Sequence, residues 1–304
     1  MRKKIVGISI LIILAGIGGI LGKKFVYEPV QDIEPVIWSC YSTDTNGYVN
    51  GGAIYSYDVQ NKEKKLVGNI ALDCISSDGK GILTGVQNMF PNANGFKGIV
   101  TYNTYSGEIV EVISTSRIFD MLEGDNPIFY GNIQMDSSQE NFYFLCGGKM
   151  FKYAVNEDRL TILFDTPSNQ CVLSQNEESL YFTENQCLYL YDLQNDERVK
   201  LLESVYKFAI SSDEDMIAYE NKSEKKICLY IVSTKENKEI VQLKHSGVQL
   251  HISDNSKYLL FTDYKELIIP TNYNIEIGIY DFVNNQISIV YKGTAEENFR
   301  TVLF

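Results

Sequence analysis

The feature that most constrains the fold is a short apolar segment that ends in tyrosine, continues into a polar turn and recurs six times along the chain. Its clearest copy spans residues 188–192, with the sequence Leu-Tyr-Leu-Tyr-Asp. The recurring tyrosines are Tyr57, Tyr102, Tyr153, Tyr191, Tyr230 and Tyr280, which are 45, 51, 38, 39 and 50 residues apart. A four-stranded propeller blade takes about 40–50 residues. Because short apolar runs alternate with turn residues between the tyrosines, the sequence predicts an all-β chain folded as a six-bladed β-propeller.

The two ends of the repeat region predict how the ring closes. The fourth blade has four predicted strands, of which the innermost spans Gln170–Leu173. The first blade has only three, at Val36–Tyr41, Ala53–Val59 and Lys65–Ile70, and lacks an innermost strand. The chain ends in a further strand-like segment, Phe299–Phe304. We therefore expect this C-terminal strand to complete the first blade and close the ring without an exposed sheet edge.

The turn after the innermost strand shows a second repeated pattern. It reads Ser76-Ser77-Asp78-Gly79 in the second blade, and related turns occur at 136–138, 211–214 and 253–256. Ser and Asp suit such a turn because their side chains accept hydrogen bonds from nearby backbone amides. The stretch from Ser76 to Leu83 resembles the repeats of the TolB-like or PD40 (WD40-like) family of bacterial six-bladed β-propellers. This resemblance extends over most of residues 35–304 and implies the same architecture.

The N-terminal segment predicts a membrane attachment. Basic residues 2–4 precede an uncharged run, Ile5–Leu21, and Lys23 and Lys24 follow it. As a helix, these 17 residues would extend about 25 Å, slightly less than the roughly 30 Å hydrocarbon core, and lysine snorkelling can supply the difference. The pattern fits a transmembrane helix or a signal peptide. Since neither an Ala-x-Ala cleavage site nor a cysteine that could be lipidated follows the run, the sequence favours an uncleaved signal anchor.

The basic residues around this run also predict the orientation of the chain. Residues 1–24 have five basic side chains and no acidic one, which places the N-terminus in the cytoplasm and the remainder outside. The expected organisation is a signal anchor at 1–24, a linker at 25–34 and a propeller at 35–304. The chain would then be a single-pass protein of the cell membrane with an extracytoplasmic propeller.

The net charge narrows the class of partner. The whole chain has a formal net charge of −12, so the residues after the predicted anchor have a net charge of −17. A surface this acidic repels nucleic acid and anionic lipid headgroups, and it favours cations and basic partners. We expect no nucleic-acid partner and no membrane contact other than the N-terminal helix.

The predicted topology gathers the long loops on one face. Strands in a blade alternate in direction, so the connections between second and third strands and between blades meet on one face, which we call the long-loop face. The turns between first and second and between third and fourth strands lie on the opposite, short-turn face. The four longest predicted loops, all on the long-loop face, are Ser42–Gly52, Gln87–Lys97, Ser114–Pro127 and Asp263–Asn274.

These loops contain the candidate binding residues, because long loops on a rigid scaffold commonly form binding sites. The candidates, mostly aromatic and apolar, are Tyr48, Met89, Phe90, Phe96, Arg117, Phe119, Met121, Tyr264 and Tyr273. Arg117 would be a charged anchor beside the apolar side chains. Alternatively, these side chains pack against one another and cap the ring.

The sequence predicts no catalytic residue, cofactor or metal. It contains no Gly-x-Ser-x-Gly, phosphate-binding glycine loop or His-Glu-x-x-His motif. His245 and His251 are the only histidines, and His251 falls within a predicted strand. The segment Asp44–Gly47 resembles half of a calcium loop but lacks the further acidic positions, so a hairpin turn is expected. Six scattered cysteines, all within predicted strands, indicate mainly free buried thiols.

Two functions of different class fit these features. The preferred hypothesis is a membrane-anchored extracytoplasmic module that binds or scaffolds a protein, peptide or glycan through its long-loop face. The alternative is a propeller-fold hydrolase or lyase with a site at the mouth of the central channel, since the fold alone does not decide function. An enzyme of that kind should bring two carboxylates, or a histidine and a carboxylate, together at that mouth.

Overall fold

The structure of the chain is a computed structural model that describes residues 33–43, 49–88, 96–122, 128–245, 248–266, 273–293 and 298–304. These residues belong to one unit, Ile33–Phe304. The predicted signal anchor at 1–24 and most of the linker lie outside the described residues. Within the described part of the chain, no helix is long and apolar enough to cross a membrane.

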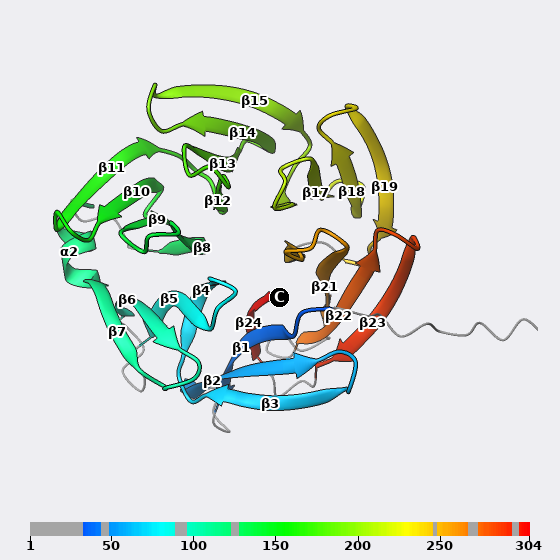
Figure 1. The fold of residues 1–304 in the computed structure, drawn as a ribbon, viewed down its shortest axis with the longest axis horizontal. Coiled ribbons are helices and arrows are strands. Elements are labelled where there is room, and N and C mark those ends of the chain that lie inside the picture. The colour runs from blue at the N-terminus through cyan, green and yellow to red at the C-terminus, as the bar shows by residue number, and fades with distance from the viewer. Residues whose placement is uncertain are drawn as a thin grey trace, which may run out of the picture. The chain divides into compact units, whose positions relative to one another are not determined.

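The described residues form six four-stranded antiparallel sheets, arranged as blades around a central axis (Figure 1). From the axis outwards, blade 1 consists of β24 (Asn298–Leu303), β1 (Val36–Thr43), β2 (Val49–Asp58) and β3 (Glu63–Gly68). Blade 2 consists of β4 (Leu72–Ser77), β5 (Ile82–Asn88), β6 (Phe96–Asn103) and β7 (Ile109–Ser114). Blade 3 consists of β8 (Phe129–Met135), β9 (Asn141–Cys146), β10 (Lys149–Ala154) and β11 (Arg159–Asp165).

The remaining blades repeat this order. Blade 4 consists of β12 (Cys171–Leu173), β13 (Ser179–Glu184), β14 (Cys187–Asp192) and β15 (Glu197–Glu203). Blade 5 consists of β16 (Lys207–Ile210), β17 (Met216–Asn221), β18 (Lys226–Ile231) and β19 (Glu236–Gln242). Blade 6 consists of β20 (Leu250–Ile252), β21 (Tyr258–Glu266), β22 (Tyr273–Asp281) and β23 (Gln286–Lys292). The predicted all-β, six-bladed architecture is confirmed.

The C-terminal strand closes the ring as predicted. β24 pairs antiparallel with β1, with Val302 opposite Trp38 and Leu303 opposite Ile37. Val302 and Leu303 are 4% and 1% exposed, respectively. The backbone N–H of Val302 also donates to Oε1 of Gln249 in blade 6, at 2.6 Å. The closing strand is therefore held by the sheet of blade 1 and by the neighbouring blade.

The recurring tyrosine has a structural cause in each blade. It lies near the end of the third strand, and the residue five positions later has a left-handed backbone. Those residues are Lys62, Gly107, Asp158, Asp196, Lys235 and Asn285. The Tyr191 hydroxyl donates to Oδ1 of Asp196 at 2.9 Å, and equivalent bonds join Tyr153 to Asp158 and Tyr280 to Asn285. The repeat thus specifies the turn that joins the two outer strands.

Adjacent blades pack through apolar and aromatic side chains. Between blades 4 and 5, for example, Phe208 is fully buried in a cluster that includes Leu188. Where blades 6 and 1 meet, the rings of Trp38 and Tyr291 lie 4.8 Å apart between centroids. The Lys64 ammonium lies 4.2 Å from the centroid of the Tyr55 ring in the same region. Aromatic and cation–π contacts therefore stabilise the joint at which the ring closes.

The predicted lengths of the long loops were wrong, because strands and a helix occupy parts of them. β21 and β22 take up half of the predicted loop Asp263–Asn274, and β1, β2, β5 and β6 extend into two of the others. The connection after β7 begins with a short helix, α2 (Thr115–Asp120). The polar residues in these segments suggested loops, but a hairpin that projects beyond a blade does not need an apolar face. A six-residue helix is too short to show a helical period.

Candidate functional site

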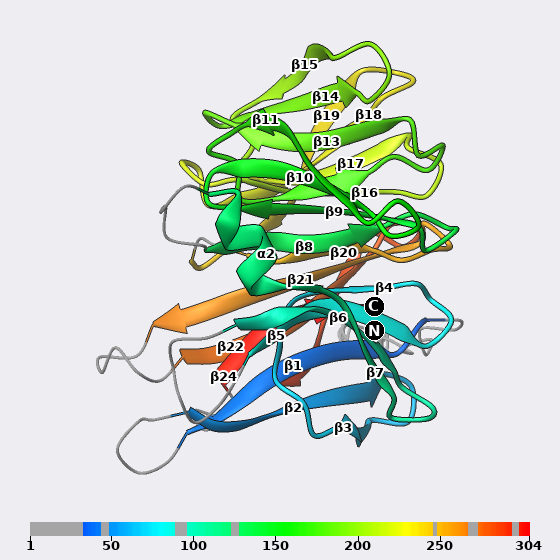
Figure 2. The ribbon, with the colours of Figure 1, turned by 90° about the vertical axis from the view of Figure 1, so that its left-hand side faces the viewer.

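The long-loop face is uneven, because three consecutive blades have elongated hairpins there. The second and third strands are joined by nine residue pairs in blade 6, eight in blade 1 and seven in blade 2. The same strands of blades 3, 4 and 5 have six pairs each. Three extra pairs raise a hairpin by about 10 Å. Figure 2 shows β21 and β22 projecting beyond the other blades. We call β1/β2, β5/β6 and β21/β22 the raised hairpins.

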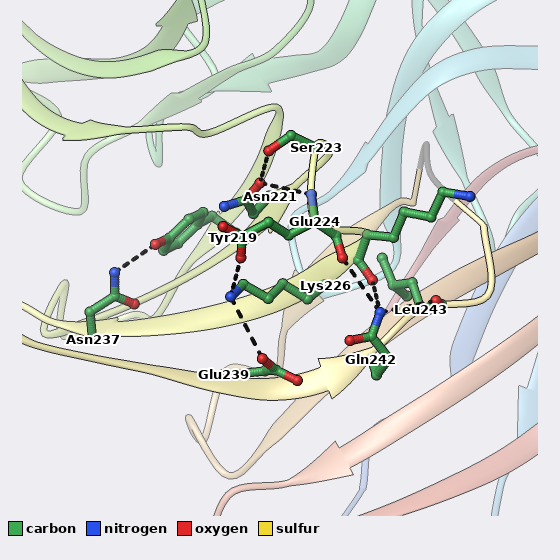
Figure 3. Close-up of polar contacts among 10 residues, drawn as sticks. Tyr219, Asn221, Ser223, Glu224, Lys226, Asn237, Glu239, Gln242 and Leu243 are labelled. Atoms are coloured by element: carbon green, nitrogen blue, oxygen red, sulfur yellow. Dashed lines mark hydrogen bonds and ion pairs between the residues drawn. The ribbon is translucent and has the colours of Figure 1, made fainter.

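The opposite side of this face is low and polar. Two-residue turns, Gly147-Gly148 and Asn185-Gln186, join the strands in blades 3 and 4. In blade 5, polar groups around the 222–225 turn bond to one another (Figure 3). Nε2 of Gln242 donates to the carbonyl of Lys225 at 2.9 Å, and Lys226 pairs with Glu224 and, at 3.6 Å, with Glu239. The polar groups around this turn therefore satisfy one another.

A ring of side chains lines the central channel. They are Cys74, Asn132, Gln170, Lys207 and Gln249, from blades 2 to 6. Four of them stand four residues before the first turn residue of their blade, and Cys74 stands four residues before Asp78 of the turn in blade 2. Together with neighbours such as Asp73, they enclose a cavity of about 320 Å³. Most of these residues stand where the innermost strands begin, so the cavity lies in the half of the channel nearer the long-loop face.

The two glutamines of the ring link neighbouring blades. Gln170 donates from Nε2 to the carbonyl of Phe208 at 2.6 Å and accepts from the Phe208 N–H at 3.0 Å. Gln249 accepts from the Val302 N–H in the same way. Adjacent innermost strands are not paired in one sheet, so an amide side chain satisfies backbone groups that would otherwise lack partners. These glutamines hold the ring together.

The charged member of the ring is Lys207. Its Nζ donates to the carbonyl of Asn169 at 3.2 Å. Burial lowers the pKa of Lys207 to about 8, although Cys74 and Glu220 nearby oppose the shift. Burial also raises the pKa of the Cys74 thiol, which therefore stays neutral. The cavity thus combines an ammonium group, a neutral thiol and amides.

This lining lacks the groups that the enzyme hypothesis requires. Among the described residues that line the cavity, Asp73 is the single carboxylate and there is no histidine. A histidine–carboxylate pair occurs elsewhere, where Nδ1 of His245 lies 3.1 Å from Oδ1 of Asp263. Asp263 also accepts from the backbone N–H of Lys244. This pair stands at the crossover between blades 5 and 6, away from the channel lining.

The described residues show no group of His, Cys, Asp and Glu side chains that could hold a metal ion. The half calcium loop Asp44–Gly47 lies outside the described residues. All six cysteines are free, and Cys40, Cys146, Cys171 and Cys228 are buried.

The predicted binding residues fall into three groups. Tyr48, Met89 and Phe90 lie outside the described residues. Phe96, Tyr264 and Tyr273 lie on the raised hairpins, in β6, β21 and β22, where the structure describes the backbone alone. The third group, Arg117, Phe119 and Met121, lies in or directly after α2.

The third group makes contacts within the propeller. Arg117 pairs with Asp158, and its guanidinium carbon lies 5.5 Å from the centroid of the Tyr153 ring. Phe119 and Met121 pack against the apolar cluster of blades 2 and 3. The structure therefore places these three residues in contacts within blades 2 and 3, beside the β5/β6 hairpin, and the role of all nine in binding stays a prediction.

Several solved structures have the same fold. TolB from Acinetobacter baumannii matches with a TM-score of 0.65 and 12% identity, over 88% of this chain and 66% of that chain. A chain of a nidogen/laminin complex matches with a TM-score of 0.62 and 10% identity, over 89% and 98%. A putative TolB from Agrobacterium tumefaciens matches with a TM-score of 0.59 and 11% identity, over 88% and 98%.

These structural matches confirm a TolB-like six-bladed propeller fold. No protein-family model and no curated protein sequence matches the chain. This chain spans about two thirds of the length of TolB from Acinetobacter baumannii.

Proposed function

We propose that this protein is a membrane-anchored, extracytoplasmic binding module that recognises a protein partner through the raised hairpins of its long-loop face. The observation that carries the proposal is the unevenness of this face. Three neighbouring blades raise hairpins beside the channel mouth, and the other three end in short turns. The raised hairpins therefore expose strand backbone and side chains to a partner on one side of the ring.

The chemistry of the face supports binding over catalysis. The channel lining contributes amides, one lysine and one carboxylate, and its glutamines are occupied in linking blades. Such a lining offers hydrogen bonds to a ligand, and its described residues bring together neither two carboxylates nor a histidine and a carboxylate. Among proteins with this fold, one match is a chain of a nidogen/laminin complex, which supports a propeller of this shape as part of a protein–protein complex.

The membrane attachment rests on the sequence of residues 1–24, and the propeller adds an orientation. β1 is the second strand of its blade, so Glu34 and Pro35 enter on the short-turn face. The raised hairpins stand on the opposite face, away from the entry of the linker. Full-length protein should stay in the membrane fraction after an alkaline wash, and protease added to intact cells should digest the propeller. Protection from that protease would refute the extracytoplasmic orientation.

Site-specific photocrosslinking in cells tests the binding face. A crosslinking amino acid at Phe96 or Tyr273, on two raised hairpins, should capture the same protein. Two controls match these positions, namely Lys222 in the low turn of blade 5 and Glu178 on the short-turn face. The partner, once identified and purified, should bind the unmodified protein more tightly than a Tyr273→Ala variant. Capture from Glu178 alone would place the partner on the other face and refute the proposal.

A further inference from the structure

Closure of the ring leaves blade 1 without an innermost turn on the short-turn face. In the other five blades a covalent turn joins the innermost strand to the second strand. In blade 1 these strands are β24 and β1, which are not consecutive in the chain. A cavity of about 370 Å³ lies beside this discontinuity. Its walls come from the start of β1, from Phe304 and from the turns of blades 2 and 6. We call it the seam pocket.

The seam pocket is acidic. Three carboxylates from three blades line it, namely Glu34 in blade 1, Asp78 in blade 2 and Asp254 in blade 6. None of the described residues that line it is a lysine or an arginine. Among the described residues, no basic side chain forms an ion pair with any of the three carboxylates. Burial and the charge of Asp254 raise the pKa of Glu34, which shows that the negative charges act on one another.

The carboxylates keep capacity for further hydrogen bonds. Oε1 of Glu34 accepts from the Asp254 backbone N–H at 3.2 Å. Oδ1 of Asp78 accepts from the backbone N–H groups of Lys80 and Ile82, at 2.7 and 2.9 Å. A carboxylate offers about four acceptor positions. Glu34 also accepts from the backbone N–H of Asn255. The second oxygen of Asp78 and the carboxylate of Asp254 therefore remain available to a donor.

Two uncharged groups complete the wall. Tyr105 is 85% exposed, and its ring lies over Gly81, where φ is +100° and a side chain would collide with the ring. The ring stands at the rim of the pocket, where an aromatic face attracts a cation. His251 contributes to the wall, and its Nδ1 is buried with no hydrogen-bond partner among the described residues. Burial lowers the pKa of His251 to about 4, so the imidazole is neutral at pH 7.

We propose that the seam pocket is a second binding site, which takes a cationic group on an alkyl chain, such as an arginine or lysine side chain of a basic peptide. The carboxylates would pair with the cation, the Tyr105 ring would cover its stem, and the neutral imidazole of His251 would add no opposing charge. This site goes beyond the proposed function, because it lies on the face opposite the raised hairpins. A free polyamine has the same chemistry as the peptide side chain.

Binding of three probes to full-length protein tests this proposal. The probes are a dye-labelled pentapeptide with two arginines, the same peptide with citrulline in their place, and spermidine. Asp254→Asn should weaken binding of the arginine peptide about tenfold, since removal of one charge from such a site costs about 1.4 kcal/mol. Tyr105→Ala should weaken it several-fold. The matched control is Glu178→Gln, which removes an exposed carboxylate from the turn of blade 4 on the same face and should change nothing.

The probes also separate the sources of the cation. Tighter binding of the arginine peptide than of spermidine supports a protein partner, and equal binding supports a free polyamine in the same pocket. Absence of binding at about 1 mM probe would overturn the site. Equal weakening by Asp254→Asn and Glu178→Gln would also overturn it, because the attraction would then come from the acidic surface as a whole. Thermal melts of each variant establish that the fold is retained.

Discussion

Replacement of Leu303 by alanine measures how much the closing strand contributes to the propeller. Leu303 is 1% exposed and packs in the apolar cluster of blades 1 and 2, with Ile54, Leu72 and Leu83. Removal of a leucine side chain from such a site costs about 2–5 kcal/mol of unfolding free energy. Whole domains are stable by about 5–15 kcal/mol. Loss of this one side chain should therefore remove a large part of the stability.

Thermal unfolding of the full-length protein, followed by circular dichroism, is the assay. A domain of this size loses about 2 °C in melting temperature per kcal/mol, so Leu303→Ala should lower it by about 4–10 °C. Val199→Ala is the surface control, because Val199 is 55% exposed in an outer strand. Leu180→Ala truncates a fully buried leucine of blade 4. If Leu303→Ala melts like Val199→Ala while Leu180→Ala does not, the closing strand does not stabilise the ring and the reasoning fails.

Three further predictions concern the interior. Gln170→Ala should cost about 1–3 kcal/mol in urea unfolding, because the backbone N–H and carbonyl of Phe208 both lose their partner. Burial lowers the pKa of His251 to about 4, below its ordinary value of 6.5, so the unfolded chain binds a proton more readily than the folded chain. The free energy of unfolding should therefore fall by about 2 kcal/mol between pH 7.5 and 5. Urea titrations of His251→Phe should lack this fall. Thiol titration without reductant should count six thiols in denatured protein and fewer in native protein, since burial raises the pKa of Cys146 and Cys171 to about 12.

The blades were predictable because their signals are local. The tyrosine at the end of the third strand and the left-handed residue five positions later belong to one turn, so each copy can be recognised without the others. The Asp or Asn after the tyrosine strengthens the signal, as in Asp192, whose Oδ1 accepts from the backbone of Gln194 and Asn195. The closing strand was predictable because blade 1 lacked a strand that the other blades possess. Counting strands was sufficient, and the register of Val302 opposite Trp38 followed.

The lining of the central channel was harder to predict, because its residues are brought together only when the ring closes. The channel residues come from separate blades and form no motif in the sequence. A signal existed, since Asn132, Gln170, Lys207 and Gln249 each stand four residues before the repeated turn, but it appears only when the blades are aligned by that turn. Arg117, Phe119 and Met121 were predicted as binding residues with the other candidates because their loop was expected on the long-loop face. The structure places them instead in contacts between blades 2 and 3, through Asp158 and the apolar cluster.

The way the ring closes determines what each face can do. When the innermost strand of blade 1 comes from the C-terminus, the first strand in the sequence must be a second strand, and a second strand begins on the short-turn face. The entry of the linker and the discontinuity between β24 and β1 therefore share that face, which is where the seam pocket lies. The hairpins between second and third strands can project only on the opposite face. A propeller closed in this way separates the entry of Glu34 and Pro35 from its raised hairpins by the full height of a blade. The two proposed sites therefore lie on opposite faces, and both ligands would be able to bind together.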